Sequence, residues 1–163
     1  MAETPRVGIG FDVHRWAEGR PLMLGGIRFD GADGLMGHSD GDVVCHALAD
    51  ALLGAAALGD VGEHFPESDP TLEGIAGLDL LARTLVLIAD AGFAAASCDL
   101  TVIGDRPPIA TRRPEMRSAL AGVLGLAVGA VSVKATRPEG LGLQGDGVGC
   151  IAIALLEPIA GSR

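Results

Sequence analysis

The sequence predicts an α/β or α+β fold in which helices cover one face of a β-sheet. Apolar runs with strand character alternate along the chain with alanine- and leucine-rich runs of helical periodicity. Breaks rich in glycine and proline separate these runs, and the 25 glycines indicate many tight turns and close backbone contacts. With 163 residues, the chain is long enough for one well-packed domain, residues 1–163, and too short for two ordinary ones.

The chain is expected to begin with a strand and then to cross a polar loop into a helix. The helix has an apolar stripe of valine, leucine and alanine at helical spacing, and a carboxylate before it is a common helix cap. The predicted elements are a strand over 7–11, one or two short strands over 21–29 with a Gly-Gly break, a loop over 30–41, and a helix that Asp40 or Asp42 caps and that ends near Leu58.

The rest of the chain continues the alternation of helices and strands. Gly92 ends the second helix, and a run containing two prolines separates the next strand from the third helix. The predicted elements are a loop over 60–76, a helix over 77–91, a strand over 97–103, a helix over about 112–124, a strand over 131–136, a glycine-dense loop over 139–149, and a strand over 150–156.

The composition indicates a core made of small aliphatic side chains. Hydrophobic residues make up 48% of the chain but aromatic residues only 3%, with no Tyr and one Trp. Such a core packs close elements well but offers few large side chains to bury. An oligomer that shares its core across subunits would compensate for this shortage, which we take as a hypothesis.

The formal charge of −9 arises from 12 basic and 21 acidic residues. The longest basic run is Arg112-Arg113, so we expect no nucleic-acid partner. Anionic small molecules remain compatible with this charge, because a metal ion and backbone N–H groups can bind phosphate locally.

Cysteine usage and hydropathy predict a cytoplasmic protein. Cys45, Cys98 and Cys150 are odd in number and far apart, which fits a reducing compartment where a free thiol packs as a small apolar group. The first residues lack the pattern of a secretory signal. Because the apolar runs are far shorter than the roughly 18 residues that a membrane helix needs, we expect no membrane partner.

A candidate metal site lies in the first fifty residues, which hold three of the four histidines. Asp12 and His14 are two residues apart in a predicted strand, so their side chains leave the same face. His46 lies early in the following helix. Two imidazoles and a carboxylate on rigid elements suit zinc, and an open fourth position is typical of catalytic zinc.

Simpler interpretations of these residues remain open. Asp12 and His14 could be an ordinary pair at a strand end, with the carboxylate accepting hydrogen bonds from the backbone. His46 could pair with Asp42 or Asp50 on its own helix, and a carboxylate there could equally orient a metal ligand.

Three further polar residues lie near the ends of predicted elements. Asp60 could cap a turn just after the helix that carries His46. For His64 we favour a solvated loop residue. Glu139 follows a strand at its carboxyl end, where magnesium would bind only if a polyphosphate supplied most of the ligands.

Seven motifs, taken together, carry a resemblance to a known family. They are Gly10-Phe11-Asp12-Val13-His14, His38-Ser39-Asp40-Gly41-Asp42, His46, the run from Asp50 to Gly62, Phe65-Pro66, Val133-Lys134-Ala135-Thr136 and Glu139-Gly140-Leu141-Gly142. With these motifs the chain resembles the 2-C-methyl-D-erythritol 2,4-cyclodiphosphate synthase family from Val7 to about Leu156.

The resemblance implies both an architecture and a reaction. The architecture is a single mixed β-sheet covered on one face by helices, in a homotrimer whose sheets face the threefold axis and whose active sites lie between adjacent subunits. The reaction is the cyclisation of 4-diphosphocytidyl-2-C-methyl-D-erythritol 2-phosphate with release of CMP. It is catalysed by a phosphorus–oxygen lyase of the non-mevalonate route to isoprenoid precursors.

The resemblance also implies roles for individual residues. Asp12, His14 and His46 would bind Zn²⁺ or another divalent metal, and Glu139 would bind Mg²⁺ that bridges the substrate diphosphate. His38 and Arg137 are the expected catalytic residues, one stabilising the transition state and the other contacting phosphate. The expected substrate-binding residues are Asp12, Val13, His14, His38, Ser39, Asp60, Val61, Gly62, Phe65, Pro66, Glu67, Ser68, Asp69, Gly104, Asp105, Arg106, Pro107, Pro108, Ile109, Ala110, Ala135, Thr136, Arg137, Pro138, Glu139 and Leu143.

The chain departs from the family pattern near the expected nucleotide site. Pro108 stands where the family usually has a lysine. A cation near the cytidine is therefore lost unless Arg106 or Arg112 replaces it. Arg137 stands where the family usually has a threonine, so a hydroxyl is exchanged for a donor of charge-assisted hydrogen bonds. In the last glycine-rich loop, Asp146 stands where the family usually has a basic residue.

Two other functions stay open at this point. The altered nucleotide loop would suit another zinc-dependent phosphotransfer or phosphodiester enzyme on the same scaffold. A non-catalytic relative that binds metal or nucleotide is the second alternative.

Overall fold

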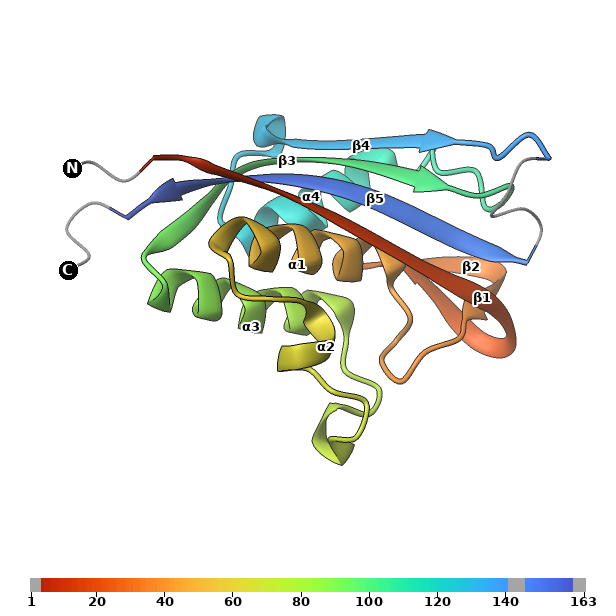
Figure 1. The fold of residues 1–163 in the computed structure, drawn as a ribbon. Coiled ribbons are helices and arrows are strands. Elements are labelled where there is room, and N and C mark those ends of the chain that lie inside the picture. The colour runs from red at the N-terminus through yellow and green to blue at the C-terminus, as the bar shows by residue number, and fades with distance from the viewer. Residues whose placement is uncertain (1–3, 141–145, 160–163) are drawn as a thin grey trace.

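The computed structural model describes residues 4–140 and 146–159. Within them, five strands form one sheet in the order β2-β1-β5-β3-β4 (Figure 1). Strand β1 pairs antiparallel with β2 and β5, β3 pairs antiparallel with β5, and β4 pairs parallel with β3, so the sheet is mixed. The strands are β1 (Arg6–Leu24), β2 (Ile27–Leu35), β3 (Phe93–Ile103), β4 (Val131–Thr136) and β5 (Gly147–Pro158).

Three long helices lie together on one side of the sheet and make the second layer (Figure 1). They are α1 (Val43–Ala56), α3 (Gly77–Asp90) and α4 (Arg113–Leu124). Shorter turns are α2 (Val61–His64), η1 (Pro70–Leu72) and η2 (Val128–Ala130). The predicted mixed α/β fold, with one sheet and helices on one of its faces, is confirmed for the described residues.

Strand β1 is much longer than the predicted strand over 7–11. Its first half, to Arg15, pairs with β5, and its second half, from Trp16, pairs with β2. The end of β2 also occupies part of the predicted 30–41 loop. These predictions were wrong because strand pairing, with distant β5 for the first half of β1 and with β2 for the second half, extends the strands through polar residues that a local reading assigns to loops.

Helix α1 packs directly on β1 because glycines remove the side chains between them. A Cβ at Gly8 would lie 2.0 Å from the Ala51 carbonyl oxygen, and one at Gly10 would lie 1.9 Å from the Ala47 carbonyl oxygen. The helix is alanine-rich on this face, so the two backbones approach closely. Because β-strand side chains alternate, Asp12 continues the row of Gly8 and Gly10 and therefore faces the helix.

The opposite face of the sheet exposes a row of large apolar side chains. Val7, Ile9, Phe11 and Val13 of β1 are 68%, 69%, 50% and 45% exposed, and Ile153 of β5 is 45% exposed. A contiguous apolar face of this kind is unusual on a monomer and typically marks an interaction surface.

Asp42 fixes the start of α1. It is fully buried, and its carboxylate accepts hydrogen bonds from the backbone N–H groups of Val44 and Cys45 at the helix N-terminus and of Gly25 and Gly26 in the β1–β2 turn. Of the two predicted caps, Asp42 is therefore the one used. The same four bonds set the position of the helix turn that carries His46.

The structure holds, over the described residues, no helix with both the length and the apolar character needed to cross a membrane.

Candidate functional site

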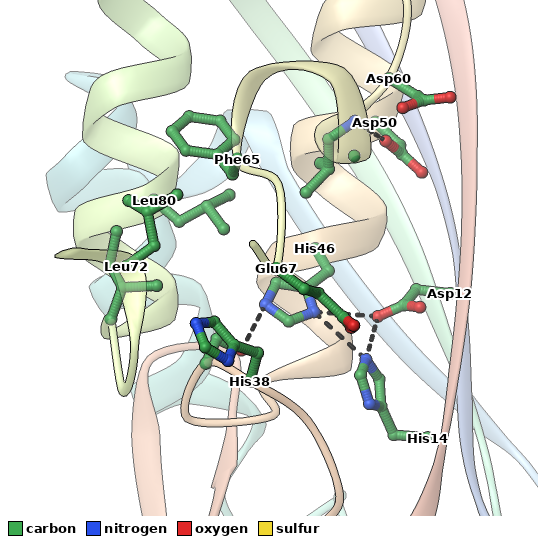
Figure 2. A pocket seen from close by; sticks show the side chains of 14 residues that line it. Asp12, His14, His38, His46, Asp50, Asp60, Phe65, Glu67, Leu72 and Leu80 are labelled. Atoms are coloured by element: carbon green, nitrogen blue, oxygen red, sulfur yellow. Dashed lines mark hydrogen bonds and ion pairs between the residues drawn. The ribbon is translucent and has the colours of Figure 1, made fainter. Parts of the chain in front are cut away.

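Asp12, His14 and His46 come together between β1 and α1, and Figure 2 shows their side chains pointing toward one another. Asp12 Oδ2 lies 2.8 Å from His14 Nε2 and 3.0 Å from His46 Nδ1. The two imidazole nitrogens are 3.3 Å apart. Within residues 4–140 and 146–159, this is the one group of three or more His, Cys, Asp or Glu side chains whose geometry suits a metal ion.

The outer nitrogens of both imidazole rings are engaged by the loop that precedes α1. His14 Nδ1 bonds the Met36 carbonyl oxygen, which can only accept, so Nδ1 carries the proton and Nε2 presents a lone pair. His46 Nε2 lies 2.9 Å from Ser39 Oγ, leaving Nδ1 to face Asp12. When both rings are neutral and carry their proton on the outer nitrogen, His14 Nε2 and His46 Nδ1 present lone pairs beside the Asp12 carboxylate, as metal ligands do. The donor set therefore fits a divalent metal.

Arg20 holds this loop in place. Its guanidinium, on β1, donates to the carbonyl oxygens of Gly37 and Ser39, and is itself half-buried. The Ser39 side chain is nearly buried, with 7% of the residue exposed, and its Oγ also accepts the Gly41 N–H at 3.0 Å. Arg20 and the Gly41 N–H thus hold in place the loop that orients both histidines.

The protonation preferences of Asp12 and His14 follow from their contact. Burial alone would raise the pKa of Asp12, but hydrogen bonds and charge from the two histidines outweigh it and hold that pKa well below its usual value. Burial would lower the pKa of His14, but the hydrogen bond and charge of Asp12 raise it. Burial also raises the pKa of the neighbouring Asp50, whose carboxylate accepts the Val61 N–H at 2.8 Å.

A cavity of about 310 Å³ opens beside the three ligands. Figure 2 shows Phe65, Leu72 and Leu80 on one side, Asp12 and His14 on the other, and His38 and Glu67 between them. The Nε2 atom of His38 is buried and has no hydrogen-bond partner. The predicted site residues that line this cavity are Asp12, His14, His38, Ser39, His46, Asp60, Val61, Gly62, Phe65 and Glu67.

Four predicted residues of this region do not line the cavity. Val13 projects from the opposite, open face of β1. Pro66 and Ser68 are exposed in the loop, and Asp69 caps η1 by accepting the Thr71 N–H at 2.9 Å.

The cavity also contains residues that the sequence interpretation did not assign to it. They are Asp50, Leu72, Ile75 and Leu80. Asp50 lies one helical turn after His46, a spacing that was visible in the sequence. No local signal pointed to the three apolar residues, because distant segments bring them to the cavity.

The simpler interpretations of several polar residues can now be decided. Although Asp42 and Asp50 share its helix, His46 pairs with Asp12, and Asp12 contacts two imidazoles rather than backbone alone. Asp60 does cap a turn, accepting the Glu63 N–H at 3.0 Å at the start of α2, and it also lines the cavity. The expectation of a solvated loop for His64 was wrong: His64 belongs to α2, is half-buried, and its Nε2 bonds the Leu58 carbonyl oxygen at 2.7 Å.

A second cavity of about 380 Å³ lies at the carboxyl ends of β3 and β4. The predicted residues that line it are Gly104, Asp105, Arg106, Pro107, Pro108, Ile109, Ala110, Ala135, Thr136 and Arg137. Arg113, which was not predicted, lines it too. Pro138 is buried outside the lining, Glu139 is exposed just after β4, and Leu143 lies outside the described residues. The two cavities share none of their lining residues.

The chain is similar in sequence and in structure to known proteins. The model of the YgbB family matches residues 5–157. A bifunctional enzyme IspD/IspF of Anaeromyxobacter sp. strain Fw109-5 is 51% identical over 159 residues, which cover 96% of this chain and 41% of that protein. A 2-C-methyl-D-erythritol 2,4-cyclodiphosphate synthase of Symbiobacterium thermophilum is 49% identical over 152 residues, covering 92% of this chain and 97% of the relative.

Solved structures agree with these sequence matches. The bifunctional IspDF of Campylobacter jejuni superposes with a TM-score of 0.91 at 36% identity, over 96% of this chain and 43% of that one. A 2C-methyl-D-erythritol-2,4-cyclodiphosphate synthase in a CDP-bound form superposes with a TM-score of 0.86 at 35% identity, over 93% of this chain and 100% of that one. The chain spans about two fifths of the length of the bifunctional relatives, at 41% and 42%, and nearly all of the single-function ones.

Proposed function

The chain belongs to the YgbB family, and we propose that it converts 4-diphosphocytidyl-2-C-methyl-D-erythritol 2-phosphate to 2-C-methyl-D-erythritol 2,4-cyclodiphosphate with release of CMP, in isoprenoid precursor synthesis. The observation that carries this proposal is the convergence of Asp12, His14 and His46 at the edge of a cavity. Relatives at 47–51% identity bear the name of this synthase or of a bifunctional enzyme that contains it. A cytoplasmic location suits such an enzyme and is part of the proposal.

The reaction is an intramolecular phosphoryl transfer. An oxygen of the 2-phosphate forms a bond to the β-phosphorus of the diphosphate, and the bond from that phosphorus to the CMP oxygen breaks. The nucleophile is already ionised, so no protein nucleophile is required, and the step depends on positioning and on neutralising charge. Ser39 lines the first cavity, but its hydroxyl is engaged by His46 Nε2 and the Gly41 N–H, which is consistent with chemistry that uses no serine nucleophile.

Asp12, His14 and His46 would hold zinc, and Glu139 would hold magnesium together with the diphosphate. When bound, these cations neutralise charge on the phosphate oxygens and align the two reacting groups. Glu139 suits a site in which the diphosphate supplies most of the magnesium ligands. It is exposed, and the described residues place no second carboxylate with it in a metal-binding group.

The protein groups around the metal ligands would bind and orient the substrate. The unpartnered His38 Nε2 is positioned to hydrogen-bond a phosphate or hydroxyl in the first cavity. Asp60 and Gly62 would hold the erythritol hydroxyls, and the phenyl ring of Phe65 would exclude water from that side. In the second cavity, the loop from Gly104 to Ala110 would surround the cytidine, and Arg137 would contact a phosphate as a catalytic residue.

A homotrimer would join the two cavities into one active site. In a single chain they share no lining residue, whereas a substrate with a nucleotide at one end and a phosphorylated polyol at the other must reach both. We assign the apolar open face of the sheet, which includes Val7, Ile9 and Phe11, to the contact between three subunits. Light scattering on the purified protein is expected to give three times the monomer mass. Ile9→Glu should dissociate this species, and a wild-type monomer at micromolar concentration would contradict the assignment.

The experiment that tests the function is turnover of the diphosphocytidyl substrate, with quantification of both products. We expect CMP and the cyclic diphosphate in equal amounts. CMP with a linear product would favour a different zinc-dependent phosphotransfer or phosphodiester enzyme. The altered loop at Pro108 is the observation that favours testing this alternative. Binding of metal or nucleotide without any product would identify a non-catalytic relative.

A further inference from the structure

Three arginines line the second cavity, but they differ in what else they contact. Arg106 forms an ion pair with Asp33 at 3.7 Å, and its guanidinium lies 4.6 Å from the centre of the Trp16 ring. Arg137 is exposed at the end of β4. Arg113 is half-buried, and its Nε atom is buried without a hydrogen-bond partner. Arg113 is therefore the cavity arginine with an unsatisfied donor.

The neighbouring Arg112 is engaged outside the cavity. Its guanidinium bonds both carboxylate oxygens of Glu115, at 2.6 and 2.7 Å, and donates to the Arg28 carbonyl oxygen at 3.0 Å. It also lies 5.2 Å from the Phe29 ring centre. The expectation that Arg106 or Arg112 replaces the cation missing at Pro108 is thus not supported for Arg112, which does not line the cavity.

The chemistry of a guanidinium restricts what can satisfy Arg113. Guanidinium groups only donate hydrogen bonds and keep their charge, so the natural partner is an anionic acceptor such as phosphate. One carboxylate, Asp105, also lines this cavity, but it is exposed and forms no ion pair with Arg113. An anionic ligand that enters the cavity can supply the missing acceptor.

We propose that Arg113 binds a phosphate of the nucleotide in the second cavity and so supplies the cation that the loop lacks at Pro108. The inference rests on the proposed function for the identity of the nucleotide. It assigns a specific role to an arginine at the first residue of α4, a position outside the predicted site. It also predicts that the phosphates, more than the nucleoside, depend on Arg113.

Calorimetric titration of the folded protein with CDP and, separately, with cytidine tests this inference. Arg113→Met keeps the apolar stem and removes the charge. We expect it to weaken CDP binding about tenfold or more, which corresponds to about 1.4 kcal/mol. Cytidine binding should stay within about twofold, since a charge-assisted bond to phosphate is the contact removed. Arg112→Met, on the adjacent residue, is the matched control and should leave both affinities unchanged. Pro108→Lys in the Arg113→Met background should restore part of the lost CDP affinity.

The outcomes separate this inference from the proposed function. Turnover with wild-type CDP affinity in Arg113→Met would refute the role of Arg113 and leave the function intact. An equal loss for CDP and cytidine would place Arg113 on the nucleoside and would also refute the phosphate assignment. A wild-type protein that neither binds CDP nor releases CMP would refute both proposals. If Arg113→Met does not fold, Arg113→Gln carries the same expectations.

Discussion

Ser39 offers a sharp test of how the candidate metal ligands are oriented. Its hydroxyl lies 2.9 Å from His46 Nε2 and 3.0 Å from the Gly41 nitrogen, and the residue is only 7% exposed. We predict that Ser39→Ala lowers zinc affinity, because His46 would lose the partner that fixes its ring and its tautomer. Loss of such an outer partner typically costs about 10–100-fold in metal affinity, or about 1.4–2.7 kcal/mol.

The same substitution has a separate and smaller effect on stability. It leaves the Gly41 N–H without its acceptor, which typically costs about 1–3 kcal/mol when the donor is buried. Metal affinity must therefore be measured on folded protein, by competition with a chromophoric chelator at a temperature well below the melting midpoint. Ser118→Ala is the matched control, because Ser118 is exposed and its hydroxyl bonds only the Pro114 carbonyl oxygen.

Two results would refute the reasoning for Ser39. Unchanged zinc affinity in folded Ser39→Ala would show that the hydroxyl does not orient His46. A loss of the same size in Ser39→Thr, which keeps a hydroxyl, would attribute the effect to crowding at this buried position rather than to the hydrogen bond.

Three further predictions concern the metal ligand and the packing that positions it. His46→Ala should abolish zinc binding and turnover with little loss of fold, since two remaining ligands hold zinc poorly; full zinc occupancy by elemental analysis would reject the assignment. Gly10→Ala should destabilise the protein by about 3 kcal/mol or more in chemical denaturation, because its Cβ would lie 1.9 Å from the Ala47 carbonyl oxygen, and a smaller loss would show that α1 can shift. Asp42→Ala should cost about 3 kcal/mol or more, since four backbone donors lose one carboxylate; the exposed Asp30→Ala should change stability little, and equal losses would contradict this account.

Local patterns were sufficient for the three long helices and for the pairing of Asp12 with His14 on one strand face. Apolar periodicity and capping residues are local signals, and they placed α1, α3 and α4 within about two residues of their observed bounds, as expected for strongly periodic segments. The alternation of side chains along a strand put Asp12 and His14 on one face, and the structure brings His46 to them.

The contacts that depend on tertiary structure could not be predicted from local sequence patterns. The length of β1 follows from its pairing first with β5, whose residues lie at the other end of the chain, and then with β2. The hydrogen bond that His14 donates to the Met36 carbonyl oxygen and the contact of Arg20 with the loop require the folded β1–β2 hairpin. Arg112 and Arg113 are adjacent and chemically identical, so only the direction of the α4 start decides which of them reaches the cavity.

The proposed metal-dependent cyclisation can be observed in the phosphorus NMR spectrum of the substrate after incubation with metal-free protein, and again after zinc is restored. We predict no conversion without metal, followed by CMP and a pair of coupled ring phosphates once zinc is added. Full conversion by metal-free protein, or CMP with only a linear phosphorylated product after zinc addition, would contradict this prediction.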